Sequence, residues 1–262
     1  MDSTETNPIK RKIYFASDFH LGIPNHDESL KREKLLVEWL TEIQEDAEEI
    51  FLMGDIFDFW YEYKTVVPKG YVRLLGKLAE ITDNGIPIHL FRGNHDVWAF
   101  DYLNKEINIQ LHRKPLIREF NNKRFYLAHG DGLGPGDNGY KMLKKVFECR
   151  LCQWLFRWLH PDIGARMALY FSRQSRLANI LKEGKNDRES HDYKDEMLYH
   201  YAKKMAGEGI DVDYMIFGHR HLPLNVPITE NTRLILLGDW LTNFSYAVFD
   251  GSELRSEFFR KA

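Results

Sequence analysis

Short apolar runs, each ending in a polar turn, alternate with longer amphipathic stretches in the first half of the chain. Four of these runs are predicted to be buried strands, at residues 13–17, 50–53, 86–91 and 124–128. Between them, residues 28–46 and 71–84 carry apolar side chains at helical spacing, and Gly85 is placed to end the second helix. This alternation predicts an α/β fold whose functional groups gather at the carboxyl ends of the strands.

The last third of the chain is rich in predicted strands. Apolar runs joined by tight turns occupy residues 214–217, 234–237, 244–249 and 254–258. Asp250 and Gly251 lie between the last two runs and form a hairpin signal. We expect these strands to form a second sheet that packs on the first.

Residues 135–205 have a different pattern and are predicted to be helical. Apolar residues at helical spacing from Leu143 to Trp158 predict one helix, which Pro161 ends. Further helices are expected at about 163–181 and 193–208, with a polar loop at 185–192. The expected organisation is a single domain over residues 1–262 with a helical insertion at about 135–205.

Composition excludes several classes of protein. The chain has 262 residues, of which 44% are hydrophobic and 14% aromatic, enough for a packed core. Two cysteines, Cys149 and Cys152, are too few for a disulfide framework and are expected to be buried or partly exposed thiols. Residues 1–12 lack an apolar segment, and no run approaches the length of a spanning helix, so a cytoplasmic protein is expected.

Polar residues suited to bind metal ions follow five of the apolar runs. Each turn alone is ordinary, but the ordered set D-x-H, GD, GNHD, HGD and GHxH is specific. Carboxylates, an amide oxygen and imidazoles are the ligand mix that a pair of divalent ions requires, with a carboxylate bridging ions about 3.5–4 Å apart. Asp55 is the candidate bridge. The candidate ligands are Asp18, His20, Asp55, Asn94, His129, His219 and His221.

The interval between His129 and His219 is more than twice any earlier interval in the series, and it is basic and aromatic. Nine basic residues lie between Tyr140 and Lys182, against two acidic ones. Such helices suit an anionic membrane surface or a cleft for a lipid with a charged head group. The alternative is a helical cap with a solvated basic face. Nucleic-acid binding is disfavoured, because the aromatics have core-like helical spacing and form no open stacking platform.

The order of the five turns resembles the calcineurin-like metallophosphoesterase superfamily, from residue 13 to about residue 224. The resemblance implies a four-layer α/β-β/α sandwich, two divalent ions, most commonly manganese, and the seven ligand roles given above. It also implies that His95, oriented by Asp96, is an electrostatic stabiliser or general acid. The implied reaction is in-line attack of an activated water on phosphorus.

Three further segments are similar to the UDP-2,3-diacylglucosamine hydrolases of the lipid A pathway. These are 54–60, 129–133 with Asp137 and Tyr140, and 175–182. The similarity implies a helical lid over the acyl chains of a UDP-linked acylated sugar, and a peripheral position on the cytoplasmic face of the inner membrane. The implied substrate-binding residues are Asn94, His95, Asp137, Tyr140, Ser175, Asn179, Lys182 and His219.

Two residues depart from that family's pattern. His95 stands where the family has an arginine, and Arg220 stands where a small residue is usual. An imidazole also suits substrates with poorer leaving groups. The alternatives are therefore a metallophosphoesterase acting on another phosphodiester, nucleotide or phosphoprotein, and a metal-free scaffold of the same fold.

Overall fold

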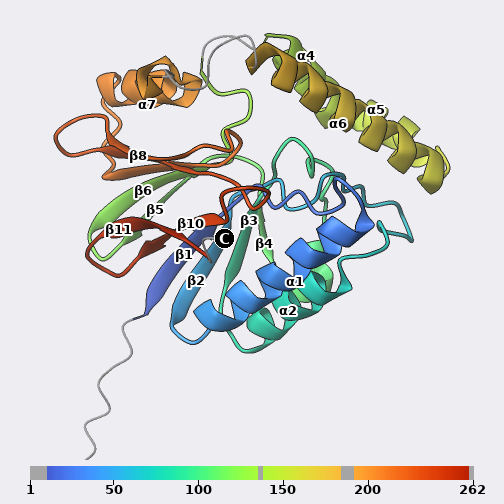
Figure 1. The fold of residues 1–262 in the computed structure, drawn as a ribbon, viewed down its shortest axis with the longest axis horizontal. Coiled ribbons are helices and arrows are strands. Elements are labelled where there is room, and N and C mark those ends of the chain that lie inside the picture. Colours follow the sequence, from blue (N-terminus) through green and yellow to red (C-terminus); the bar gives the residue numbers. More distant parts are fainter. Residues whose placement is uncertain (1–10, 135–137, 184–191, 260–262) are drawn as a thin grey trace, which may run out of the picture.

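Two β-sheets lie face to face at the centre of the molecule, with helices on their outer sides (Figure 1). The computed structural model describes residues 11–134, 138–183 and 192–259, with side chains in these ranges except at 138 and 175–183. The first sheet has the strand order β11-β10-β1-β2-β3-β4 and the second has the order β5-β6-β7-β9-β8.

The first sheet combines a parallel centre with an antiparallel edge. Strands β1 to β4 are parallel neighbours, whereas β10 runs antiparallel to β1 and β11 antiparallel to β10. The strand bounds are β1 Lys12–Ala16, β2 Ala47–Leu52, β3 Ile88–Phe91, β4 Gln110–His112, β10 Ser245–Phe249 and β11 Leu254–Phe258.

The second sheet has the same mixed character. Strand β7 lies parallel to β6 and to β9, and the edge strands β5 and β8 are antiparallel to their neighbours. The strand bounds are β5 Leu116–Phe120, β6 Lys123–Ala128, β7 Tyr214–Phe217, β8 Pro223–Pro227 and β9 Arg233–Leu237.

Alternation of side chains along the strands produces the layers. Phe15, Phe51 and Leu127 point between the sheets and form one buried cluster, while their chain neighbours point outward to the helices. Helices α1 (His26–Ile43) and α2 (Val72–Asp83) cover the first sheet, and α7 (Met197–Gly207) covers the second. The short α3 (Tyr102–Ile107) lies beside α2 and β4. The predicted four-layer α/β-β/α sandwich is confirmed.

The prediction was wrong about how strands are shared between the sheets. The last two strands, β10 and β11, pair onto β1 in the first sheet, with Ile13 opposite Phe249. Strand β6, from the first half of the chain, lies in the second sheet beside β7. Apolar patterning shows that a strand is buried on both faces, but it does not show which neighbour supplies its hydrogen bonds. The predicted hairpin at Gly251 is confirmed, with φ +91° at that residue.

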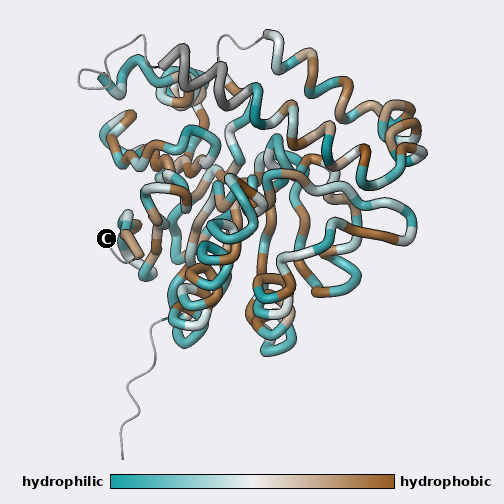
Figure 2. The backbone as a smooth tube through the Cα atoms, turned by 45° about the vertical axis from the view of Figure 1, so that its right-hand side comes forward, coloured by the Kyte–Doolittle hydropathy of each residue, from teal (hydrophilic) through white to brown (hydrophobic). Residues whose placement is uncertain are grey.

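Three helices, α4 (Asn138–Glu148), α5 (Arg150–Arg157) and α6 (Pro161–Glu183), stand over one end of the sandwich, and we call them the lid helices (Figures 1 and 2). The single helix predicted up to Trp158 is instead divided at Cys149. The Phe147 carbonyl accepts hydrogen bonds from the side chains of Trp98 (2.9 Å) and Gln153 (2.8 Å), and it does not continue the helical ladder. Cys149 and Cys152 are free thiols; Cys152 is partly exposed as expected, whereas Cys149 is exposed, because it lies at the break between α4 and α5.

An aromatic cluster attaches the lid helices to the core. The core side of this cluster consists of Phe59, Tyr61, Val97 and Trp98. The lid side consists of Phe147, Phe156 and the α6 residues Ala165, Ala168 and Leu169. The Tyr61 hydroxyl also donates to the Gln153 carbonyl at 2.6 Å. None of the helices in the described ranges combines the length and the apolar character that crossing a bilayer requires.

Arg32 stabilises the turn after β1 from a buried position on α1. Its guanidinium donates to the carbonyls of Phe19 (2.7 Å), His20 (2.6 Å) and Ile23 (2.6 Å). We expect Arg32→Met to lower the free energy of unfolding by about 2–4 kcal/mol, because buried carbonyls then lack donors. Urea unfolding measures the loss. Lys31→Met is the matched control on the same helix, since Lys31 is 73% exposed; equal losses in both variants would contradict this role of Arg32.

Candidate metal centre

The five polar turns found in the sequence meet at one end of the two sheets. Each follows the carboxyl end of β1, β2, β3, β6 or β7. Backbone hydrogen bonds join these turns. Asp18 N–H donates to the Gly54 carbonyl at 3.0 Å, and His20 N–H donates to the Asp55 carbonyl at 2.9 Å. Gly218 N–H donates to the His129 carbonyl at 2.9 Å. Parallel strands place their carboxyl ends at the same edge, and this arrangement brings the two sheets' turns together.

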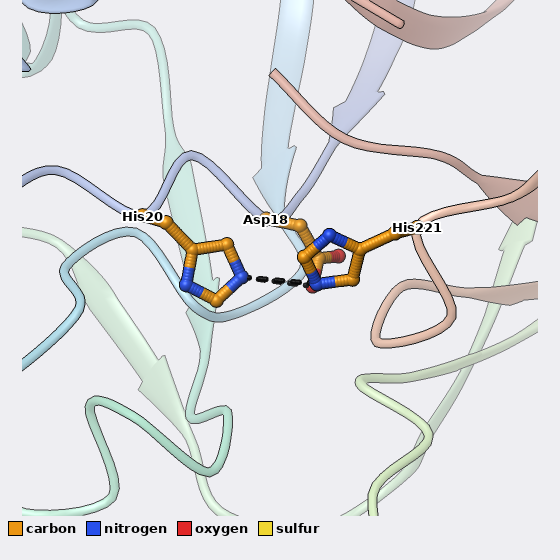
Figure 3. A group of neighbouring side chains, drawn as sticks. All are labelled: Asp18, His20 and His221. Atoms are coloured by element: carbon orange, nitrogen blue, oxygen red, sulfur yellow. Dashed lines mark hydrogen bonds and ion pairs between the residues drawn. The ribbon is translucent and has the colours of Figure 1, made fainter. Parts of the chain in front are cut away.

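One cluster of potential metal ligands contains Asp18, His20 and His221 (Figure 3). The two Nε2 atoms lie 3.1 Å apart, and Asp18 Oδ1 lies 3.4 Å from His221 Nε2 and 3.6 Å from His20 Nε2. Asp18 Oδ1 is buried and accepts no hydrogen bond from the described residues. Three converging ligand atoms, one of them a buried oxygen without a donor, fit a cation.

Asp55 belongs to two further clusters, one with His20 and His95 and one with His129 and His219. Its Oδ2 lies 3.4 Å from His129 Nε2 and 3.8 Å from His20 Nε2. Asn94 joins this group through its side-chain oxygen, 3.4 Å from His129 Nε2. The structure therefore brings all seven predicted ligands together, with Asp55 between the two halves of the centre.

Five of the seven candidate ligand residues sit on strained backbone. Asp18, His20, Asp55, His219 and His221 have φ values of 58°, 45°, 54°, 68° and 50°. This left-handed region costs a residue with a β-carbon roughly 1–2 kcal/mol. Strain of this kind persists only where the surroundings fix it, and it is concentrated at functional sites.

Three glycines allow the turns to approach each other closely. A β-carbon on Gly54 would lie 2.5 Å from His129 Nδ1, and one on Gly218 would lie 2.6 Å from Asp18 Oδ2. A β-carbon on Gly93 would overlap the Asp55 carboxylate. At these three positions the absence of a β-carbon lets His129, Asp18 and Asp55 lie close to the neighbouring backbone.

The electrostatics of the centre fit bound cations. Burial alone would lower the pKa of His20 and His129, but nearby carboxylates outweigh it and raise these pKa values to about 9 and about 10. Burial would likewise raise the pKa of Asp18 and Asp55, and the adjacent histidines hold both pKa values below their usual range. Without metal, protons on His20 and His129 thus compensate the negative charge of the buried carboxylates. Divalent ions supply this positive charge instead when the imidazoles are neutral.

His219 and His95 differ from the other histidines. Burial, followed by the charge of His129, lowers the pKa of His219 to about 4, and burial also lowers the pKa of His95. These imidazoles stay neutral near pH 7. A neutral imidazole offers the lone pair that a metal ion or an incoming proton needs.

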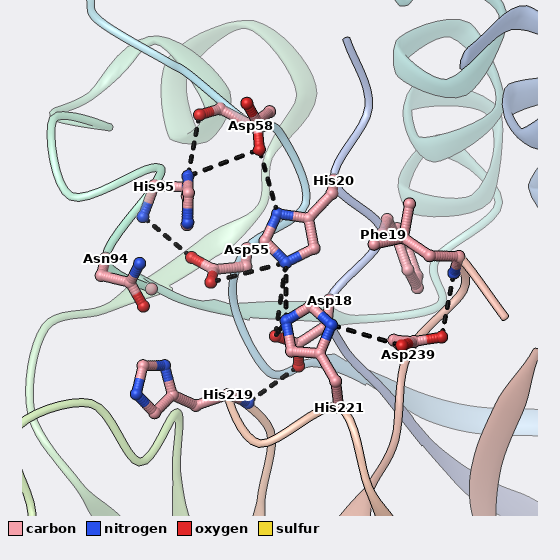
Figure 4. Close-up of polar contacts among 12 residues, drawn as sticks. Asp18, Phe19, His20, Asp55, Asp58, Asn94, His95, His219, His221 and Asp239 are labelled. Carbon is pink, nitrogen blue, oxygen red and sulfur yellow. Dashed lines mark hydrogen bonds and ion pairs between the residues drawn. The ribbon is translucent and has the colours of Figure 1, made fainter. Parts of the chain in front are cut away.

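Asp58, not Asp96, contacts the His95 ring (Figure 4). His95 Nδ1 lies 3.0 Å from the Asp58 carbonyl oxygen and 3.5 Å from its carboxylate. The Asp96 carboxylate instead accepts the backbone N–H groups of Gly93 (2.7 Å) and Ile56 (2.8 Å), so Asp96 shapes the turn. Burial, followed by the charge of Asp55, raises the pKa of Asp96 to about 6. Asp58 follows Asp55 in the same polar turn, which is the signal that could have identified it.

Asp239 is a second residue that sequence reasoning missed. Its Oδ2 lies 3.2 Å from Nδ1 of His221, and its Oδ1 accepts backbone N–H groups from the next turn. Although burial opposes the effect, His221 and these amides lower the pKa of Asp239 to about 2. Asp239 follows Gly238 at the end of a predicted strand, the same arrangement as Gly54 and Asp55, and that repetition was the available signal.

The implied substrate-binding residues are only partly described. The Tyr140 hydroxyl donates to Asp131 Oδ2 at 2.5 Å, and Lys144 Nζ contacts the same oxygen at 2.7 Å. Tyr140 also lies near the metal centre, its ring centroid 6.4 Å from that of His219. Asp137 lies outside the described residues, as do the side chains of Ser175, Asn179 and Lys182.

Comparisons with known proteins agree with this geometry. The model of the calcineurin-like phosphoesterase family matches residues 11–223. The UDP-2,3-diacylglucosamine hydrolase of Porphyromonas gingivalis is 39% identical over 94% of this chain and 97% of its own length. Proteins of the same name from Aeromonas hydrophila and Haemophilus influenzae are 26% and 27% identical, over 93% and 88% of this chain and 96% and 92% of theirs.

Gly93 provides a test of the centre that leaves every ligand in place. We expect Gly93→Ala to displace Asp55 and to weaken manganese binding at least about tenfold, as is typical when groups that position ligands are disturbed. Calorimetric titration of the metal-free protein measures the affinity. Gly76→Ala is the matched control, since a β-carbon there meets nothing within 4 Å. Native affinity in Gly93→Ala would refute the role of Asp55.

Proposed function

The chain belongs to the calcineurin-like phosphoesterase family, and we propose that it hydrolyses the diphosphate of UDP-2,3-diacylglucosamine to UMP and 2,3-diacylglucosamine 1-phosphate. The observation that carries the proposal is a complete ligand set in a chain 39% identical, over 94% of its length, to a hydrolase of that name. The products place the reaction in lipid A biosynthesis.

Asp18, His20 and His221 would hold one ion, and Asn94, His129 and His219 would hold a second. Asp55, which lies in clusters with His20 and with His129 and His219, would be available to both. Two divalent ions in such a site supply a water of lowered pKa and positive charge for the phosphoryl oxygens. The mixture of carboxylate, amide and imidazole donors suits a metal of intermediate hardness, and manganese is the ion proposed.

His95 stabilises the charge that develops on the phosphoryl group. Its Nδ1 donates to the Asp58 carbonyl, which leaves Nε2 for the substrate. The Asp58 carboxylate at 3.5 Å favours a protonated ring once a phosphate lies beside it. The departing sugar phosphate needs little protonation, so charge stabilisation is sufficient. Asn94, His95, Tyr140 and His219 form the described part of the proposed substrate site, and Asp137, Ser175, Asn179 and Lys182 complete it.

The lid helices offer a surface suited to acyl chains and to a membrane. Among the described side chains of these helices and of the residue that ends α5, the exposed apolar ones are Met142, Leu143, Val146, Leu151, Trp154, Leu155, Trp158, Ile163, Met167, Tyr170 and Phe171. Basic side chains on the same helices favour anionic lipid by about 1 kcal/mol each near the surface. We propose that the protein works as a peripheral enzyme on the cytoplasmic face of the inner membrane.

One specific observation keeps a second function in view. An imidazole at position 95 can protonate a poor leaving group, so a phosphoesterase acting on another phosphodiester, nucleotide or phosphoprotein is the alternative. A metal-free scaffold is disfavoured because all seven ligands are present.

Activity on a defined substrate tests the proposal. With manganese, the purified protein should release UMP from UDP-2,3-diacylglucosamine, and Asp55→Ala or His129→Ala should lower kcat/KM by at least about a hundredfold. The rate of UMP release measures both the native activity and the kcat/KM of each variant. Asp211→Ala is the control, with a side chain 89% exposed in an ion pair with Arg124. Rapid turnover of a soluble diester with none of the acylated substrate would favour the alternative.

Membrane contact is tested separately. We expect Trp154→Ser combined with Trp158→Ser to weaken binding to phosphatidylglycerol vesicles about tenfold or more, because two exposed aromatic rings no longer enter the lipid. Vesicle sedimentation measures the partition coefficient, and added salt should lower it further. Val72→Ser changes a residue that is 68% exposed on α2 and should have no effect. Unchanged binding by the double variant would exclude this surface.

A further inference from the structure

A buried carboxylate at the start of α7 holds the turn that carries two of the metal ligands. Glu196 is 2% exposed and immediately precedes α7. Arg220, between His219 and His221, donates to it from two nitrogens: Nε to Oε1, and Nη2 to Oε2 at 3.2 Å. Within the described ranges, Arg220 is the side chain that binds this carboxylate. Two parallel N–H···O bonds fix orientation as well as distance.

The turn needs support from outside itself. His219 and His221 have φ values of 68° and 50°, so both ligands sit on left-handed backbone. Within the turn, Arg220 N–H donates to the Gly218 carbonyl at 2.8 Å; from outside it, Asp18 Oδ2 in the turn after β1 accepts from His219 N–H at 2.9 Å. A strained conformation of this kind is retained when surrounding contacts fix it, and Glu196 supplies one from a different part of the chain.

The start of α7 also contacts the turn that follows His129. A β-carbon on Gly130 would lie 3.0 Å from Leu198 Cδ1, and one on Gly134 would lie 2.9 Å from the Met197 carbonyl. Residues 196–198 therefore touch the turns at both ends of the long interval between His129 and His219.

We propose that Arg220 and Glu196 form a positioning pair that sets the geometry of both halves of the metal centre, an inference that rests on the metal roles proposed above. His221 clusters with Asp18 and His20, whereas His219 clusters with Asp55 and His129. A single ion pair thus holds one ligand for each proposed ion. Its loss weakens both binding events together, whereas loss of a ligand confined to one cluster weakens mainly one.

The first test variant is Glu196→Gln. Arg220 is about one-third exposed (33%), so water can solvate its guanidinium when the carboxylate is removed, and the fold is expected to persist. Calorimetric titration of the metal-free protein with manganese should show both dissociation constants raised about tenfold or more. The rise in Tm on adding manganese should shrink accordingly.

Two further variants separate position from charge. Glu196→Gln with Arg220→Gln leaves no unpaired buried charge and should weaken both events as the single variant does. Arg220→Lys keeps the charge but loses the planar fork, so its affinities should fall between those of the native protein and Glu196→Gln. Urea unfolding of the metal-free variants checks that the fold is intact.

A control removes another Arg–Glu pair, which joins β5 to β2. Arg118 Nη2 donates to both oxygens of Glu49, at 2.8 and 3.1 Å, on β5 and β2. Glu49→Gln with Arg118→Gln should leave manganese affinity at its native value. An equal loss of affinity in this control would overturn the inference, because any lost Arg–Glu pair would then have the same effect.

The remaining outcomes are distinguishable. Absence of manganese binding by the native protein would refute the proposed function itself. Two binding events in the native protein, with native affinities in both Glu196 variants, would overturn the positioning role and leave the function standing. Weakening of only one event would overturn the claim that the pair serves both halves.

Discussion

Buried negative charge at the junction of two sheets is the constraint on which the rest of the structure depends. Asp18, Asp55 and Asp58 are each at most 2% exposed, and a carboxylate removed from water must find compensating charge and hydrogen bonds. Imidazoles supply the charge within the protein, and backbone amides supply part of the hydrogen bonding: His95 N–H donates to Asp55 Oδ1 at 2.9 Å. Left-handed turns and closely packed glycines make this crowding sterically possible.

The position of the centre follows from how the sheets pack. Phe15 stacks on Phe51 within the first sheet, with centroids 5.2 Å apart, and on Phe125 of the second sheet at 5.9 Å. These rings lie within the strands whose ends carry ligands, so the aromatic core sets the distance between turns from different sheets. Asp55 on one side and His129 on the other then meet at 3.4 Å. A substitution in this core would shift the candidate metal ligands as well as cost stability.

The sequence predicts what depends on local patterning, and it fails where partners are far apart in the chain. Apolar runs ending in polar turns identified every metal-ligand candidate, because strand ends and ligand types are both local. Asp58 and Asp239 were missed because each acts through a residue distant in sequence, His95 and His221. The break between α4 and α5 at Cys149 was missed for the same reason, since the Trp98 side chain donates a hydrogen bond to the Phe147 carbonyl. The pairing of β10 with β1 likewise depends on residues at opposite ends of the chain.

A hydrogen bond from α6 to Asp58 links the lid helices directly to the metal centre. Ser172 on α6 donates to Asp58 Oδ2 at 3.0 Å, while Asp58 Oδ1 lies 3.4 Å from His20 Nδ1 and 3.5 Å from His95 Nδ1. One buried carboxylate therefore contacts a proposed ligand, the proposed phosphoryl-stabilising imidazole and the helix over the site. Aromatic packing at Trp98 also anchors the lid helices to the core. Since packed interiors do not deform continuously, a displacement of α6 would also act on His20 and His95 through the Asp58 carboxylate.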